Sequence, residues 1–196
     1  IQTREMKAMG ANILLANTYH LLLRPGDRIV EKMGGLHDFM AWQAPILTDS
    51  GGFQIFSLAG TKNKTGESLV KLSDKGVEFK SFIDGKKYYV TPEEAFAIQH
   101  RLDTDIAVCL DECVALPADR QQVEKAVALT TNWAEKTKEY YKKIENQKGK
   151  NVLPLLFGVV QGGLDRELRR RSLKELTSIG FDGYNIGGLS VGESNQ

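Results

Sequence analysis

The strongest constraint on the fold is a short apolar run that occurs five times in the sequence and each time ends abruptly in polar or glycine residues. Apolar runs of this length are typical of strands that are buried on both faces, as in a parallel sheet. Helical patterns separate several of the runs, so the sequence predicts the alternation of strand and helix of an α/β protein. The predicted strands are 13–16, 46–47, 106–110, 155–160 and 184–186.

Polar or glycine residues at the ends of all five predicted strands bear on the type of α/β fold. A TIM barrel carries functional residues at the carboxyl ends of many strands, whereas a doubly wound sheet gathers them at one switch point. We therefore expect an irregular (β/α)8 TIM barrel, with the doubly wound sheet as the alternative. A complete barrel has eight strands and about 250 residues. Because only about five barrel strands fit the sequence, we expect residues 1–196 to be a fragment, a partial TIM-barrel catalytic domain.

Three segments carry helix signals. Residues 91–94, Thr-Pro-Glu-Glu, are typical of a helix start, with threonine as the N-cap and proline at the first helical position. A long amphipathic helix is expected from Asp119, and a third helix spans 164–179 and ends at Gly180. Three leucines of the third helix are expected to face the protein core: Leu168, Leu173 and Leu176.

Residues of about 61–90 have a different period from the rest of the chain. Apolar and polar residues alternate in 69–72, 77–82 and 87–90, and glycine-containing turns separate these runs. Such alternation predicts antiparallel hairpins, here inserted between two barrel strands.

Composition argues against a membrane protein. No apolar run approaches the roughly 18 residues of a membrane span, and the N-terminus has no signal peptide, which favours a cytoplasmic protein without a membrane partner. The 26 Lys and Arg nearly balance 25 Asp and Glu, so net charge does not indicate nucleic acid. Cys109 and Cys113 have neither zinc-site nor redox spacing, and we expect free thiols and no metal site in this chain.

The residues after the second, third and fourth predicted strands are candidates for chemistry. Asp49 is either a helix cap or a functional acid, and the glycine pair behind it favours function, because glycines let a ligand approach the backbone. Asp111 directly ends a buried strand, although acidic pairs commonly lie in solvent. Gln161 can both donate and accept hydrogen bonds, which suits recognition of a mixed polar edge.

The loop 187–190, Gly-Gly-Leu-Ser, is either a phosphate cradle or an open backbone edge. No dinucleotide or Walker motif occurs, so a nucleotide cofactor is not expected. Two carboxylates, an amide, bare backbone and an aromatic ring fit a flat heterocycle that is read at its rim. We therefore expect five residues to converge on one slot that is as thick as a nucleobase: Asp49, Phe53, Asp111, Gln161 and Gly188.

Five motifs resemble the tRNA-guanine transglycosylase family, the queuine or preQ1 tRNA-ribosyltransferases. They are ANTYHLLLRPG (16–26), LTDSGGFQIFSL (47–58), DEC (111–113), GVVQGG (158–163) and IGGLSVGE (186–193). The resemblance implies an irregular TIM barrel with hairpin insertions. It also implies exchange of guanine at the wobble position of G-U-N tRNAs for preQ1, by double displacement at ribose C1′. No organic cofactor is implied.

The resemblance assigns roles to the first group of residues. Asp49 corresponds to the general acid/base, and Phe53 corresponds to a ring that stacks on the purine. The residues that correspond to the floor of the family's purine pocket are Ser50, Gly51 and Gly52. Asp111 corresponds to the acceptor for the N1–H and exocyclic amine of guanine.

A second group corresponds to the far rim of the pocket. Gln161 and the Gly188 amide are implied to donate to the O6 and N7 side, and Leu189 contributes backbone. Glu193 corresponds to a residue that supports the Leu189 peptide. Cys113 and Val191 match the bacterial form, and we expect Val191 to obstruct the larger base queuine and so favour preQ1.

The family's covalent nucleophile, an aspartate, and its Zn²⁺ ligands correspond to positions beyond Gln196. We therefore expect Zn²⁺ only in the full-length family member, and a homodimer that binds the anticodon stem-loop of tRNA. A basic segment of the third helix is either a solvated face or a tRNA contact: Arg166, Arg169, Arg170, Arg171 and Lys174. Three alternatives remain, namely the queuine-inserting form, a non-catalytic paralogous subunit, and a retaining glycosidase that uses Asp49 and Asp111.

Overall fold

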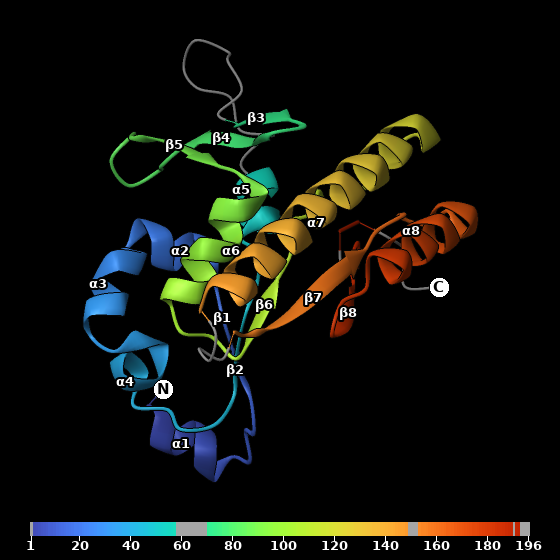
Figure 1. The fold of residues 1–196 in the computed structure, drawn as a ribbon. Helices are drawn as coiled ribbons and strands as arrows, with labels where there is room; N and C mark the ends of the chain where they lie inside the picture. Colours follow the sequence, from blue (N-terminus) through green and yellow to red (C-terminus); the bar gives the residue numbers. More distant parts are fainter. Residues whose placement is uncertain (1, 58–69, 149–152, 190, 193–196) are drawn as a thin grey trace.

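A computed structural model describes residues 2–57, 70–148, 153–189 and 191–192 of the chain. It contains a five-stranded parallel sheet and a separate three-stranded antiparallel sheet (Figure 1). The parallel sheet consists of β1 (Leu14–Ala16), β2 (Ile46–Thr48), β6 (Ile106–Val108), β7 (Leu155–Val160) and β8 (Gly183–Ile186). These strands lie within or at the five runs predicted from the sequence.

The order of the parallel strands is β1-β2-β6-β7-β8, which is their order along the chain. Each neighbouring pair is parallel. A doubly wound sheet reverses its strand order at the switch point, and the described strands show no such reversal. The architecture is therefore an α/β fold with a parallel sheet, consistent with part of a TIM barrel, whereas a closed barrel is not observed.

Helices cover one face of this sheet (Figure 1). On that face Leu14, Ile46 and Leu156 are fully or almost fully buried. On the other face Leu15 is 68% exposed and Leu155 is 50% exposed, and the register places both in one row across the sheet. The prediction of strands buried on both faces is therefore wrong for this row. It holds at the carboxyl ends of β6 and β7, where the adjacent residues Ala107 and Val108, and Val159 and Val160, are all buried.

Helices α6 (Pro92–Arg101), α7 (Arg120–Lys148) and α8 (Arg166–Ile179) correspond to the three predicted helices. Thr91 caps α6, since its side chain accepts a hydrogen bond from the backbone N–H of Glu94. Gly180 ends α8 at φ 82°, as predicted. The inward assignment of Leu173 is wrong: its side chain is 46% exposed, while Ser172 is completely buried. Ser172 lies one turn from both Leu168 and Leu176, and Leu173 is rotated about 100° away from that stripe.

Five short helices were not predicted from the sequence: α1 (Thr3–Ala8), α2 (Thr18–Leu23), α3 (Asp27–Lys32), α4 (Gly35–Met40) and α5 (Gly52–Ser57). Their lengths of six residues give little periodic signal. Helix α2 begins at the end of β1, where the Asn17 side chain accepts a hydrogen bond from the backbone N–H of His20. Helix α5 begins just after β2, in the glycine-containing segment singled out above.

The antiparallel sheet consists of β3 (Val70–Ser73), β4 (Gly76–Lys80) and β5 (Lys87–Val90). It confirms hairpins in the second part of the predicted insertion, whereas residues 61–69 lie outside the described residues. Val77 and Phe79 anchor the sheet in the larger hydrophobic core.

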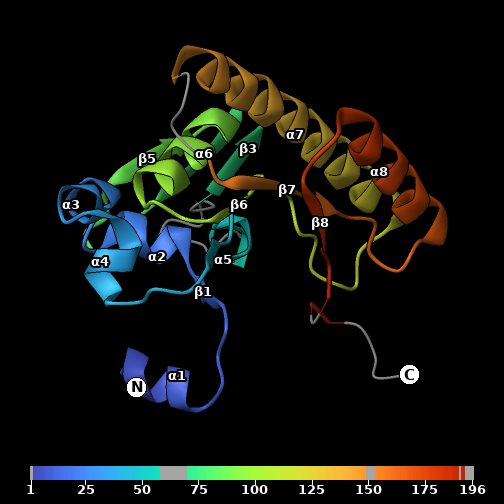
Figure 2. The ribbon, with the colours of Figure 1, turned by 60° about the horizontal axis from the view of Figure 1, so that its bottom comes forward.

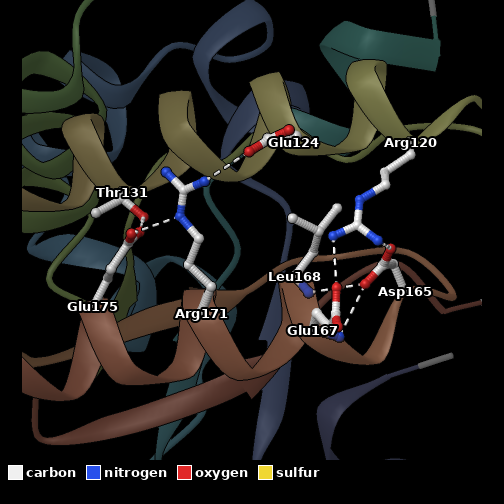
Figure 3. A network of polar contacts seen from close by, with 8 residues as sticks. All are labelled: Arg120, Glu124, Thr131, Asp165, Glu167, Leu168, Arg171 and Glu175. Carbon is white, nitrogen blue, oxygen red and sulfur yellow. Dashed lines mark hydrogen bonds and ion pairs between the residues drawn. The ribbon is translucent and has the colours of Figure 1, made fainter.

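Helices α7 and α8 lie side by side (Figure 2) and are joined by ion pairs across their surfaces (Figure 3). Between the helices, Arg120 pairs with Asp165 and Glu167, and Arg171 pairs with Glu124. Arg171 also pairs with Glu175 within α8. Because at least one side chain of each pair is 43% exposed or more, each pair contributes little stability, about 0.2–1 kcal/mol. In the described part of the chain, no helix is both long enough and apolar enough to cross a membrane.

Candidate active site

The candidate site lies where the parallel strands end. Carboxyl ends of parallel strands meet at one edge of a sheet, so the segments after β1, β2, β6, β7 and β8 come together although up to about 170 positions separate them. Hydrogen bonds between these segments define the geometry of the site.

Asp111, which follows β6, is at the centre of the site and is 8% exposed. Ser50 Oγ donates to its Oδ1 at 2.9 Å, and Gln161 Nε2 donates to its Oδ2 at 2.7 Å. Burial raises the pKa of Asp111, and the two donated hydrogen bonds oppose that effect. The segments after β2 and β7 thus fix one buried carboxyl group, and each oxygen of a carboxylate can accept more than one hydrogen bond.

Asp49, which follows β2, is held by the segment that follows β1. Oδ1 accepts from the backbone N–H of Thr18 at 2.9 Å, and Oδ2 accepts from Asn17 Nδ2 at 2.6 Å. The Gly51 N–H also donates to Oδ1. Burial raises the pKa of Asp49, these backbone hydrogen bonds oppose it, and the charge of Asp111 adds to the rise. The two predicted carboxyl groups therefore influence each other electrostatically.

Asn17 and Thr18 are residues that the sequence analysis did not assign to the site. Thr18 also donates from its hydroxyl to the backbone oxygen of Asp49 at 2.5 Å. Asn17 has two contacts, since it caps α2 and donates to Asp49. Their position after an apolar run, within one of the five motifs, was the signal available in the sequence.

The glycines after Asp49 bring the backbone close to Asp111. A Cβ atom on Gly52 would lie 2.7 Å from the backbone oxygen of Asp111, and a Cβ on Gly51 would lie 3.0 Å from the Tyr19 nitrogen. The Gly52 N–H donates to Ser50 Oγ at 3.1 Å, so Ser50 links this turn to Asp111. Packing at both positions therefore requires glycine.

Phe53 lies in the first turn of α5 and is 50% exposed. It lines a cavity of about 230 Å³ together with Ser57, Cys113, Ala115 and Val191. The structure thus brings together Phe53, Cys113 and Val191, which the sequence analysis placed in one pocket. Cys109 and Cys113 are not joined by a disulfide bond, in agreement with the prediction of reduced thiols.

Gln161 is 3% exposed and lies between Asp111 and the loop after β8. A Cβ atom on Gly188 would lie 3.2 Å from Gln161 Oε1, which places the Gly188 backbone beside this amide. Leu189 follows and is 60% exposed. Glu193, which was predicted to support the Leu189 peptide, lies outside the described residues.

Ser172 on α8 also supports Gln161, since its hydroxyl accepts from the Gln161 backbone N–H at 3.1 Å. We expect Ser172→Ala to lower the free energy of unfolding by about 1–3 kcal/mol, because a buried N–H group loses its partner. Ser178→Ala, an exposed change on the same helix, should alter it by less than about 0.5 kcal/mol. Urea denaturation of both variants measures the difference, and equal effects would contradict a supporting role for Ser172.

Contacts and close approaches link the segments that carry the five residues expected to converge. Asp111 contacts Gln161 directly, Gly188 lies beside Gln161, and the charge of Asp111 contributes to raising the pKa of Asp49. Phe53 follows Gly52, which packs on Asp111. Within the part of the chain that the structure describes, no three His, Cys, Asp or Glu side chains gather closely enough to hold a metal ion.

The fold and the site together define an α/β protein with a paired-carboxyl site at the strand ends of a parallel sheet. The family model described as queuine tRNA-ribosyltransferase matches residues 1–196, so the chain belongs to the queuine tRNA-ribosyltransferase family. The resemblance inferred from the five motifs is thereby confirmed.

Individual relatives agree with this family. The chain is 52% identical over 189 residues to the queuine tRNA-ribosyltransferase of Nitratidesulfovibrio vulgaris. The matched region covers 96% of the chain and 47% of the relative. It is 50% identical over 188 residues to that of Ruegeria pomeroyi, covering 96% of the chain and 46% of the relative. It is also 50% identical over 189 residues to that of a Thermoanaerobacter strain, with coverage of 96% and 46%. The chain spans about half the length of the curated relatives it matches.

Proposed function

We propose that this chain carries the base-recognition part of a tRNA base-exchange enzyme, a pentosyltransferase that replaces guanine at the wobble position of G-U-N tRNAs with preQ1. The observation that supports it most is the buried Asp111 carboxyl group, which Ser50 and Gln161 fix by hydrogen bonds. Family membership supports the same reaction class.

Asp111 is suited to the donor edge of guanine. An ionised carboxylate only accepts hydrogen bonds, and guanine presents two adjacent donors, N1–H and the exocyclic amine. In the proposed complex these two donors bind Asp111, while Gln161 and the Gly188 amide donate to the O6 and N7 side. Phe53 stacks on the purine, a contact worth about 1–3 kcal/mol.

Asp49 is the proposed general acid/base. In the first half-reaction a carboxylate attacks ribose C1′, the N-glycosidic bond breaks, and guanine leaves with a proton that Asp49 donates. In the second, Asp49 takes the N9 proton of preQ1, and N9 attacks C1′ and displaces the carboxylate. The attacking carboxylate corresponds to a family aspartate beyond Gln196. Two displacements at one carbon retain its configuration.

The choice of preQ1 over queuine depends on the cavity beside Phe53. Cys113 and Val191 line this cavity, whose volume is about 230 Å³. Val191 limits the room for the cyclopentenediol of queuine, so the preQ1-inserting form is preferred to the queuine-inserting one.

Partners and metal content follow the family. We propose a cytoplasmic homodimer that binds the anticodon stem-loop of tRNA. Zn²⁺ is expected at residues beyond Gln196, and the described residues do not fit it: Cys109 is buried, and burial raises its pKa, which disfavours the thiolate that binds zinc. No step of the proposed reaction passes through the metal.

The proposal is tested by the exchange of labelled guanine into a tRNA with a G-U-N anticodon, catalysed by a protein of the relatives' length that carries this sequence. We expect incorporation that depends on guanosine at position 34, and a tRNA with adenosine there is the matched control. Absence of exchange would favour a non-catalytic subunit, although such a subunit is expected to lack Asp49 and Asp111. Release of guanine without incorporation would favour a glycosidase.

A further inference from the structure

Arg169 differs from the other arginines of α8 in where its guanidinium lies. The sequence placed it in a basic segment that was either solvated or in contact with tRNA. Arg171 extends toward Glu124 of α7 (Figure 3), whereas Arg169 extends toward the glycine loops that follow β7 and β8. Arg169 therefore belongs to the candidate site and not to an exposed basic face.

Three nitrogen atoms of Arg169 contact two loops at once. Nε donates to the Gly163 oxygen at 2.7 Å, in the loop that carries Gln161. Nη1 and Nη2 both donate to the Gly187 oxygen at 3.1 Å, and Nη2 lies 3.5 Å from the Gly188 oxygen. A planar guanidinium with several fixed donors is suited to such a bridge, unlike the single ammonium of lysine.

The backbone around Arg169 is arranged to permit this approach. A Cβ atom on Gly162 would lie 2.7 Å from Arg169 Cγ and 2.9 Å from its Cα, so glycine at 162 lets the loop pack on Arg169. Asp165 fixes the start of α8 by accepting from the backbone N–H groups of Glu167 and Leu168. The guanidinium is thus held at a defined position beside the loops.

Anchoring the Gly187 oxygen determines where the next N–H group points. The peptide unit is planar and trans, so the carbonyl of Gly187 and the N–H of Gly188 point in opposite directions. Gly188 has φ 67°, and glycine allows such a peptide to rotate at little cost. Rotation would present a carbonyl acceptor to the base in place of an amide donor.

We propose that Arg169 is a positioning residue that keeps the Gly188 amide directed at the O6 side of the bound guanine base. The inference rests on the proposed function, because it concerns how that same site recognises its base. Arg169 acts through the loop backbone and does not itself touch the base.

The test compares guanine with 6-thioguanine, whose sulfur accepts hydrogen bonds weakly. Affinities are measured by calorimetry in a protein of the relatives' length that carries this sequence. In Arg169→Gln we expect guanine affinity to fall about fivefold or more, because a hydrogen bond is lost, and the preference for guanine over 6-thioguanine to narrow by a similar factor. Arg170→Gln, on the exposed side of α8, should match the unaltered protein.

The outcomes of this binding experiment distinguish the role of Arg169 from the proposed function of the site. An equal loss of affinity for both purines, or no loss for guanine, would overturn the role of Arg169. Binding of neither purine by the unaltered protein would overturn the proposed function itself. If Arg169→Gln does not fold, Arg169→Lys is measured in the same way, and its single donor group should also narrow the preference.

Discussion

Replacing Asp49 with alanine is expected to reduce guanine exchange by about a thousandfold or more. General acid/base groups typically contribute 10²- to 10⁴-fold to a rate, and Asp49 is the proposed group for both half-reactions. The measurement is single-turnover incorporation of labelled guanine into tRNA. Asp74→Asn, an exposed change in the β3–β4 turn, is the matched control and should retain full exchange.

The effect on chemistry must be separated from an effect on folding. Alanine at 49 leaves the Thr18 N–H and the Asn17 amide without their acceptor. Asp49→Asn retains an oxygen that can accept from Thr18 but cannot take up a proton, and it should be almost as inactive as alanine. A fully active, folded Asp49→Asn variant would exclude Asp49 as the acid/base.

The raised pKa of Asp49 also predicts how the exchange rate depends on pH. Burial, with a smaller contribution from the charge of Asp111, raises its pKa above the ordinary value of 3.8. The carboxylate form, which accepts the preQ1 proton in the proposed reaction, is therefore lost at a higher pH than for an exposed aspartate. The rate of the unaltered enzyme should accordingly fall, as pH is lowered, before ordinary carboxyl groups titrate.

The strand ends were predictable because two independent signals agree there. The apolar runs indicate buried strands, and the polar residues directly after them must lie at a common edge when the strands are parallel. Asp49, Asp111 and Gln161 follow from this reasoning alone. Their hydrogen bonds in the structure, such as Gln161 to Asp111, span 50 positions and need only the strand order to be correct.

The residues that support the site were not predictable in the same way. Arg169 and Ser172 lie on a helix whose rotation about its axis decides which side chains face the sheet. The apolar pattern placed Leu173 inward, whereas the buried stripe passes through Ser172. A difference of one residue is a rotation of about 100°, and tertiary packing determines it. Asn17 likewise requires knowledge that α2 starts directly at the end of β1.

Asp111→Asn is expected to weaken purine binding by about a hundredfold or more. Two donors of guanine lose a charged acceptor, and each hydrogen bond to a charged group is worth about 1.5–3 kcal/mol. The neutral amide keeps the bond from Ser50 and can re-pair with Gln161 if the Gln161 amide turns over. Calorimetry with guanine and preQ1 measures the loss, with Asp74→Asn again as the control.

The same variant should be at least as stable as the unaltered protein at neutral pH, because it no longer buries a carboxyl group that ionises. Burial raises the pKa of Asp111 in the folded state, so folding favours the protonated form. The stability that protonation provides is complete below the unfolded pKa and is lost as pH rises through the raised folded pKa. Asp111→Asn should lack this part of the pH dependence in urea denaturation. A variant with unchanged affinity for both bases would exclude Asp111 as the recognition group, and a large loss of stability at neutral pH would show that the carboxylate is structural.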